Sequence, residues 1–316
     1  MGKETAISWT DSTFNPWWGC TPISPGCAHC YAATLDHRTG GDCFGAGKTR
    51  RTFGEKHWNQ PLNWDKSAEK EGKLRLVFVA SMADVFDAEA PAGELEKLWD
   101  VIRKTPHLIW QILTKRSDRI AMSLPTDWGQ GYPNVWLGVT AENQEMADAR
   151  IPLLLQVPAA KRFLSCEPLI GPVDFNHCSA WNPVENNLYL EAIDWVIAGG
   201  ETGHGARPMH PDWARSLRDQ CQAAGVPFFF KQWGEWGLRN AFESFTTWCN
   251  KAPTWLDKSD VCMDTAGRIC RIGKDFQTAR DEGKFPVAFG PHVGKKDAGR
   301  ELDGREWSEM PEGVTR

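Results

Sequence analysis

The stretch Leu74-Arg75-Leu76-Val77-Phe78-Val79-Ala80, followed directly by Ser81-Met82-Ala83-Asp84, decides the fold. A short, nearly continuous apolar run of this kind is typical of a strand in a parallel sheet that is covered on its faces by helices. Similar runs recur as far as about residue 231, and longer segments with helical spacing separate them. The sequence therefore predicts an α/β fold in which helices connect parallel strands.

Seven segments fit the strand pattern, which is enough for a full or partial (β/α) TIM-like barrel with mostly parallel strands. They are Ala6–Trp9, Leu74–Ala80, Leu108–Leu113, Val135–Val139, Arg162–Cys166, Trp195–Ala198 and Pro227–Phe230. Helical spacing predicts one helix around Leu95–Ile102 and another around Trp213–Cys221, with Gly225 as its stop. The polar stretch Asn176–Leu190 predicts a loop insertion.

Length and composition fit a globular protein with a large domain and an appendage. The chain has 316 residues, of which 41% are hydrophobic, so it can bury a sizeable core. We expect residues 1–233 to form the barrel and residues 234–316 to form an irregular extension packed on it. A net charge of −5 gives no overall basic field, so nucleic-acid binding would depend on local patches.

The sequence contains no apolar run close to the roughly 20 residues that span a bilayer. Its start, MGKETA, lacks the basic residues and the apolar stretch of a signal peptide. We therefore expect a cytoplasmic protein without a membrane segment. In that reducing compartment, most of the ten cysteines should be metal ligands or free thiols.

Polar residues follow six consecutive predicted strands, where a parallel barrel gathers its chemistry. These strand-end residues are Ser81 and Asp84, Thr114–Arg116, Thr140–Asn143, Glu167, Gly199–Glu201 and Lys231–Gly234. Any one of them alone would most often be an ordinary loop or helix cap, but six together favour one shared site. The acidic residues suit an ammonium group or ribose hydroxyls, and Lys115, Arg116 and Lys231 suit carboxylate or phosphate groups.

Three cysteines near the N-terminus have the spacing C-x6-C-x2-C: Cys20, Cys27 and Cys30. Prolines and a glycine between them force turns, so the segment can wrap around a metal group. Thiolates select zinc, copper(I) or iron–sulfur clusters. A closed zinc site would need a fourth ligand, for which Cys43 and His29 are the candidates. Unligated thiols are a further alternative.

The strings NPWWGC at residues 15–20 and GCAHCYA at residues 26–32 resemble radical S-adenosylmethionine (SAM) enzymes, whose common signature is C-x3-C-x2-C. They are similar in particular to the branch with spore photoproduct lyase and DNA-repair photolyase-like proteins, but here six residues separate the first two cysteines. Most of the chain resembles an uncharacterised family frequent in phages and bacterial mobile elements. This second resemblance is carried by ISWT at 7–10, WVIAGGE at 195–201, FFKQWG at 229–234 and LDGR at 302–305.

The radical SAM resemblance implies that Cys20, Cys27 and Cys30 hold three irons of a [4Fe-4S] cluster in an N-terminal cluster loop. SAM would bind the open iron and be cleaved to a 5′-deoxyadenosyl radical. Its implied contacts, from the methionyl ammonium to the adenosine, are Ser81, Asp84, Thr140, Glu142, Asn143, Glu167, Gly199 and Gly200. The implied substrate contacts are Lys115, Arg116, Glu201, Lys231 and Trp233.

The same resemblance implies an electron donor such as flavodoxin or ferredoxin and a nucleic acid or nucleotide as substrate. A three-Cys-motif partner protein is a further candidate partner. The basic run at residues 48–51 and the 17 tryptophans suit phosphates and bases, although a solvated basic turn is the simpler interpretation.

Two other functions remain open from the sequence. One is a structural zinc or iron–sulfur protein of a phage or defence assembly, and the other is a metal-free barrel hydrolase using Glu142, Glu167 and Glu201. The spacing of Cys249, Cys262 and Cys270 is poor for a single site, so we expect no metal there.

Overall fold

The computed structural model describes residues 5–177, 189–237, 261–270, 288–290 and 292–313. Seven parallel strands form one sheet, and each strand pairs with the next one along the chain. They are β1 Ser12–Phe14, β2 Arg75–Val79, β3 Leu108–Thr114, β4 Val135–Thr140, β5 Lys161–Cys166, β6 Trp195–Gly199 and β7 Phe228–Gln232. The predicted α/β class with parallel strands is confirmed, and the sheet is a curled half-barrel with β1 and β7 at its edges.

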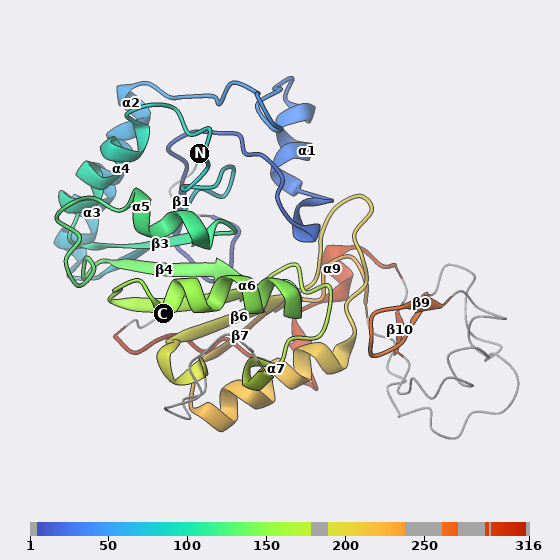
Figure 1. Ribbon diagram of the computed structural model, residues 1–316. Helices are drawn as coiled ribbons and strands as arrows, with labels where there is room; N and C mark the ends of the chain where they lie inside the picture. The colour runs from blue at the N-terminus through green and yellow to red at the C-terminus, as the bar shows by residue number, and fades with distance from the viewer. Residues whose placement is uncertain (1–4, 178–188, 238–260, 271–287, 291, 314–316) are drawn as a thin grey trace, which may run out of the picture.

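Helices lie outside the curled sheet (Figure 1). The longer ones are α1 Tyr31–Arg38, α3 Gln60–Glu71, α4 Glu94–Arg103, α6 Gln144–Leu155 and α7 Pro211–Ala224. Shorter turns are η1 Pro25–Cys27, α2 Glu55–Trp58, η2 Ser117–Arg119, α5 Ile120–Ser123, η3 Phe175–His177, η4 Tyr189–Ala192 and α9 Lys295–Ala298. Helices α4 and α7 confirm the two predicted helices, and α7 stops at Gly225, whose φ of 69° is left-handed.

Alternate residues of the strands face two separate cores. One face packs against the helices, and the other lines the inside of the curl with large aromatic side chains. Trp195 is fully buried inside the curl, with its ring centroid 6.1 Å from that of Trp9 and 6.0 Å from that of Phe229. Because Trp9 precedes β1 while Trp195 belongs to β6, this contact joins the two halves of the sheet across its interior.

The prediction for the first strand is wrong. Residues 6–9 form bends and turns, and β1 begins only at Ser12. The apolar character of this segment comes from Trp9, which is buried inside the curl. Asp11, just before β1, connects this segment to β2, since its carboxylate accepts a hydrogen bond from the backbone N–H of Leu76 at 2.8 Å.

The C-terminal part contributes small antiparallel elements. Strands β8 Val261–Met263, β9 Ile269–Cys270 and β10 Ala288–Gly290 form one sheet, and β11 Glu301–Leu302 pairs with β12 Arg305–Glu306. The segment after β12 lies against β7, where the Phe230 N–H donates to the Trp307 carbonyl at 2.9 Å. The division at residue 233 stays a prediction.

Two further predictions lie partly outside the described residues. Of the expected loop insertion, residues 178–188 are not described, and the residues on either side of them form η3 and η4. Cys249 is also not described, whereas Cys262 and Cys270 are partners in the β8–β9 pairing. Within the described ranges, no helix has the length and apolar character needed to cross a membrane.

Candidate cofactor site at the carboxyl ends of the strands

A cavity of about 150 Å³ lies at the carboxyl ends of β2, β3 and β4, and we term it the cysteine cavity. Its walls include the three half-buried free thiols of Cys20, Cys27 and Cys30. Six of the predicted strand-end residues also line it: Ser81, Asp84, Thr114, Lys115, Arg116 and Thr140. The fold thus brings the cysteine motif, which is far away in sequence, to the ends of three strands.

Cys20 lies beside the buried guanidinium of Arg116. Arg116 Nη1 donates to Cys20 Sγ at 3.3 Å, and Nη2 donates to the Thr21 carbonyl at 2.7 Å. Burial and then the negative charge of Asp84 raise the pKa of the Cys20 thiol to about 12, while Arg116 acts in the opposite direction. Burial disfavours the negative charge of the Cys20 thiolate. A metal cation bound to the sulfur would compensate for this cost, because a metal binds the deprotonated thiol.

The cysteine loop, residues 20–30, is held on one side by Glu142. This carboxylate accepts hydrogen bonds from the Ser24 hydroxyl and the Gly26 N–H, and it pairs with Arg150 at 2.6 Å. Burial opposes its charge, but Arg150 and Lys115 keep the pKa of Glu142 below its usual value. A side chain at Gly26 would place its Cβ 2.9 Å from Glu142 Oε1, so a larger residue here would require the Glu142 carboxylate to shift.

The other side of the cysteine loop is held by Arg207, whose Nη2 donates to the Pro25 carbonyl at 3.0 Å. Arg207 pairs with Glu201 at 2.5 Å, and Glu201 is buried. At the start of the loop, Arg50 Nη2 donates to Thr21 Oγ1 at 2.7 Å. In this structure Glu142 anchors the loop directly and Glu201 does so through Arg207, whereas the radical SAM resemblance implied contacts of Glu142 with the cofactor and of Glu201 with the substrate.

Asn15 and Tyr31 attach the loop after β2 to the two ends of the cysteine motif. The fully buried Asn15 donates from Nδ2 to Ser81 Oγ at 3.1 Å and accepts from the Met82 N–H at 2.7 Å. The Tyr31 hydroxyl donates to the Ser81 carbonyl at 2.6 Å. Neither residue was predicted to have a role of its own, although both belong to the strings that flank the cysteines.

Asp84 lines the cysteine cavity, but its carboxylate already accepts several hydrogen bonds from the protein. Its carboxylate accepts from Thr114 Oγ1 at 2.7 Å, from the Lys115 N–H at 3.1 Å and from the Phe86 N–H at 3.0 Å. Its ion pair with Arg116 has an N···O distance of 3.2 Å. The expected contact between Asp84 and an ammonium group would have to compete with these partners.

Two residues of the cavity wall have polar side-chain groups without a hydrogen-bond or ion-pair partner among the described residues. Thr140 is 1% exposed, and its hydroxyl has no hydrogen-bond partner among the residues that the structure describes. The half-buried Lys115 forms no side-chain hydrogen bond or ion pair within the described ranges, although its charge acts on Glu142. A buried hydroxyl without a partner costs free energy, which a ligand in the cavity would recover.

A second group of strand-end residues lies around Glu167. Lys231 Nζ pairs with Glu167 Oε1 at 2.5 Å, and a Cβ at Gly199 would be 3.6 Å from the Glu167 carboxyl carbon. Burial raises the pKa of the Tyr31 hydroxyl, and the negative charge of Glu167 adds to this effect. The group around Glu167 therefore acts on Tyr31, which is a wall residue of the cysteine cavity. Neither Glu167 nor Lys231 lines the cysteine cavity itself.

Three other predicted site residues have structural partners. Asn143 caps α6 and accepts from the Met146 N–H at 2.9 Å. Gly200 packs so closely on the Trp233 backbone that a Cβ would lie within 1.9 Å of its carbonyl oxygen. Trp233 is buried and donates from its indole to the Glu301 carbonyl at 2.8 Å.

The two candidates for a fourth zinc ligand lie away from the cavity walls. Cys43 is buried, and burial followed by its contact with Asp36 raises the pKa of its thiol to about 11. His29 lies against Gly205, where a Cβ would come within 2.9 Å of the imidazole Nδ1. Across the described ranges, no three His, Cys, Asp or Glu side chains form a group that could hold a metal ion. The three thiols therefore surround a space without converging on one point.

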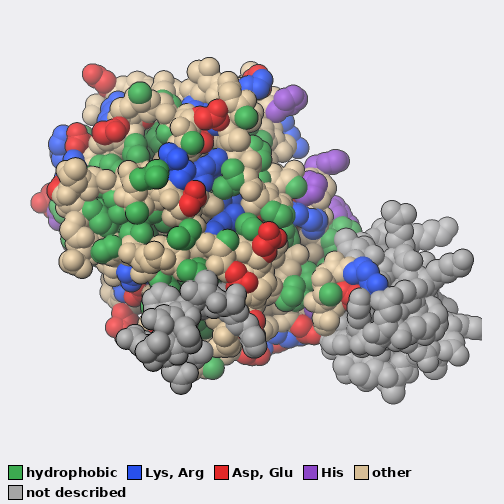
Figure 2. Space-filling model, viewed as in Figure 1, with side chains coloured by type: hydrophobic (Ala, Val, Ile, Leu, Met, Phe, Trp, Pro, Cys, Tyr) green, Lys and Arg blue, Asp and Glu red, His purple; other side chains and the backbone are tan. Residues whose placement is uncertain are grey.

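Two of the three basic side chains in residues 48–51 form ion pairs with carboxylates of the protein itself. Lys48 pairs with Asp42 at 2.6 Å, and the buried Arg50 pairs with Asp87 at 2.8 Å. Arg51 is exposed, with its guanidinium 4.9 Å from the ring centroid of Trp18. On the face shown in Figure 2, basic and acidic side chains are interspersed.

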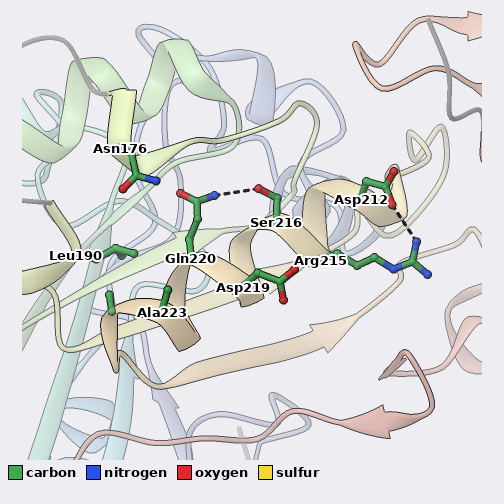
Figure 3. Close-up of a pocket in the computed structure, with 9 residues that line it drawn as sticks. Asn176, Leu190, Asp212, Arg215, Ser216, Asp219, Gln220 and Ala223 are labelled. Atoms are coloured by element: carbon green, nitrogen blue, oxygen red, sulfur yellow. Dashed lines mark hydrogen bonds and ion pairs between the residues drawn. The ribbon is translucent and has the colours of Figure 1, made fainter.

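A larger hollow of about 640 Å³ lies along α7, remote in sequence from the cysteines. Figure 3 shows two pairs among its polar side chains: Gln220 donates to Ser216 Oγ at 3.0 Å, and Arg215 donates to Asp212 at 2.9 Å. Gln220 also donates to the Val173 carbonyl at 3.0 Å. These interactions join α7 to the segment after β5, so we assign the hollow no ligand.

A sequence model of the family described as "Protein of unknown function (DUF5131)" matches residues 4–311. No curated protein matches the chain. Among solved structures, a spore photoproduct lyase mutant has a TM-score of 0.43 at 12% identity, covering 90% of this chain and 77% of that one. Another mutant, with bound AdoMet and dinucleoside spore photoproduct, has a TM-score of 0.40 at 12% identity, covering 66% and 60%. So distant a likeness carries no argument about the activity.

Proposed function

The chain belongs to the DUF5131 family of proteins of unknown function, and we propose that it is a radical SAM enzyme. The observation that supports this proposal is the cysteine cavity. Three free thiols line it, at the carboxyl ends of parallel strands, together with a lysine and a buried hydroxyl that have no side-chain partner among the described residues. This edge is where enzymes with related folds place their cofactors.

The donor set suits an iron–sulfur cluster better than a single zinc ion. Cys20, Cys27 and Cys30 would each ligate one iron of a [4Fe-4S] cluster, which leaves one iron open for SAM. A closed zinc site needs four ligands at one point, and Cys43 and His29 lie outside the cavity lining. When bound, the cluster and SAM supply a 5′-deoxyadenosyl radical that removes a hydrogen atom from the substrate.

The protein's own residues would bind and orient SAM in this cavity. We assign the Lys115 ammonium to the methionyl carboxylate of SAM and the Thr140 hydroxyl to a polar atom of the same ligand. Ser81 remains a candidate for the methionyl ammonium group. Phe44 and Tyr31, which also line the cavity, would exclude water from the reacting atoms.

We further propose a nucleic acid or nucleotide as substrate, with a flavodoxin or ferredoxin as electron donor. The flanks of the cysteine motif support this substrate class because they resemble the photolyase-like branch. The exposed Arg51, stacked beside Trp18 just before the cysteine loop, offers a guanidinium for a phosphate group. The paired group of Glu167 and Lys231 remains a candidate for contacts with the substrate.

Anaerobic reconstitution of the full chain with iron and sulfide tests the proposed function. We expect a brown protein with about four irons per chain that cleaves SAM to methionine and 5′-deoxyadenosine when dithionite is added. The Cys27→Ala variant should lose both properties, whereas Cys221→Ala, which changes a buried thiol of α7, should keep them. A colourless wild-type protein that binds one zinc ion would overturn the proposal.

A further inference from the structure

Arg116 lies between a cysteine and two carboxylates, in a buried cluster of charges. Its Nη1 is 3.3 Å from Cys20 Sγ and 3.2 Å from Asp84 Oδ2, and its Nη2 is 3.3 Å from Asp87 Oδ1. All three charged side chains are less than one-tenth exposed. Solvent and salt therefore screen these charges weakly, and each of them acts strongly on the sulfur.

We propose that Arg116 and Asp84 set the reduction potential of the iron–sulfur centre held at Cys20, in opposite directions. This inference rests on the proposed function. Reduction adds negative charge to a cluster and its sulfur ligands, so a cationic hydrogen-bond donor at a ligand sulfur stabilises the reduced form. A carboxylate on the other side of that donor opposes this effect.

The arrangement of charges gives the sign of each effect. Without Arg116, Asp84 and Asp87 would still be near Cys20, while Arg50 would compensate only Asp87, with which it pairs at 2.8 Å. The environment of the sulfur would become more negative, and reduction would become harder. Neutralising Asp84 instead leaves the Arg116 charge in place, so reduction would become easier.

Arg116 also donates to the Thr21 carbonyl, so a purely structural role has to be distinguished from an electrostatic one. A structural role predicts that any disturbance of this cluster loosens Cys20 and affects the potential in one common direction. The electrostatic role predicts that Arg116→Met and Asp84→Asn shift it in opposite directions. Arg116→Lys keeps the charge but loses the forked geometry, so its shift should be smaller than that of Arg116→Met.

The experiment is an anaerobic redox titration of the reconstituted full-length protein, followed by the electron paramagnetic resonance signal of the reduced cluster. Arg116→Met should move the midpoint potential to more negative values, and Asp84→Asn should move it to more positive values. Arg103→Met, which removes an exposed arginine at the end of α4, is the matched control and should leave the midpoint unchanged.

Shifts of Arg116→Met and Asp84→Asn in the same direction, or no shift in proteins that carry four irons, would overturn the inference and leave the proposed function intact. If Arg116→Met fails to assemble a cluster, Asp84→Asn and Arg116→Lys decide: a positive shift for Asp84→Asn supports the inference, and its absence overturns it. A wild-type protein without an iron–sulfur cluster would instead remove the proposed function and this inference together.

Discussion

Lys115 differs from the other charged residues around the cysteine cavity because its side chain has no ion-pair partner within the described ranges. Arg116 and Asp84 compensate each other, whereas the Lys115 ammonium group is at the wall with its charge available. An anionic group of a ligand would therefore find its best position there. Among the strand-end residues, this is the one that the structure favours most clearly for binding a carboxylate.

Replacement of Lys115 by methionine should weaken SAM binding by about 10- to 100-fold, the usual range for losing a hydrogen bond to a charged group. Isothermal titration calorimetry of the reconstituted, unreduced protein measures the effect. 5′-Methylthioadenosine, which lacks the carboxylate, should bind wild type and variant alike. The exposed Lys104→Met change is the control, and equal losses for both ligands would refute the assigned contact.

The sequence alone could predict which residues directly follow the strands of the sheet. The sequence placed Ser81, Asp84, Lys115 and Thr140 at strand ends, and the structure brings them to one cavity. It did not predict that Glu142 contacts the cysteine loop directly, or that Glu201 pairs with Arg207, which contacts the loop. A residue number near a strand end therefore specifies an edge of the sheet but not the direction of the side chain.

At the scale of elements, the cysteine loop owes its position to anchors from outside itself. The loop contains only the single turn η1, so its own backbone provides little regular structure. Its anchors come from the loops and helices after four different strands: Arg116, Glu142 with Arg150, Arg207, and Arg50. The geometry of the three thiols therefore depends on the completed half-barrel.

The Glu142→Gln variant should bind less iron than wild type after identical reconstitution. The amide cannot neutralise Arg150, and an unpaired buried charge costs about 3–5 kcal/mol. The expected result is a cysteine loop that is displaced more often from its cluster-binding position. The matched control, Glu145→Gln, changes an exposed acid of α6, the helix that carries Arg150, and equal iron contents in the two variants would contradict the anchoring role.

The strands from β2 to β7 were predicted to within two residues at each end because they are buried runs with clear apolar character. Helix α6 was missed, since Pro152 lies inside it and several apolar side chains are spread around its circumference. Helices α2 and α5 are single turns that carry no periodic signal. Tertiary contacts decide such elements more than local sequence preference does.

At the scale of the whole molecule, the C-terminal hairpin is attached to α7 by a charge network. Asp303 accepts hydrogen bonds from Arg215 at 2.7 Å and from Arg218 at 2.5 Å. Arg215, and then Arg218, hold the pKa of Asp303 below its ordinary value of 3.8 against the effect of burial. The carboxylate therefore stabilises the folded chain above that pH, and the contribution disappears as the pH falls through the lowered pKa.

Asp303→Asn should lower the free energy of unfolding by about 1 kcal/mol at neutral pH, since the pairs are partly exposed. Asparagine tolerates the left-handed conformation that Asp303 adopts, with a φ of 55°, so the turn itself should survive. Urea unfolding at pH 7 and below about pH 3 provides the measurement. A difference between variant and wild type that persists unchanged in acid would exclude the charge network as its cause.

The sequential order of the seven strands has a consequence for folding. Each strand pairs with the one synthesised just before it, so the sheet can grow strand by strand as the chain is made. Its last edge, β7, is paired with Trp307 and Glu309 through backbone hydrogen bonds at 2.9 and 3.2 Å. These residues are made well after β7, so the nascent half-barrel has an uncovered edge that invites strand addition from other chains until they are in place.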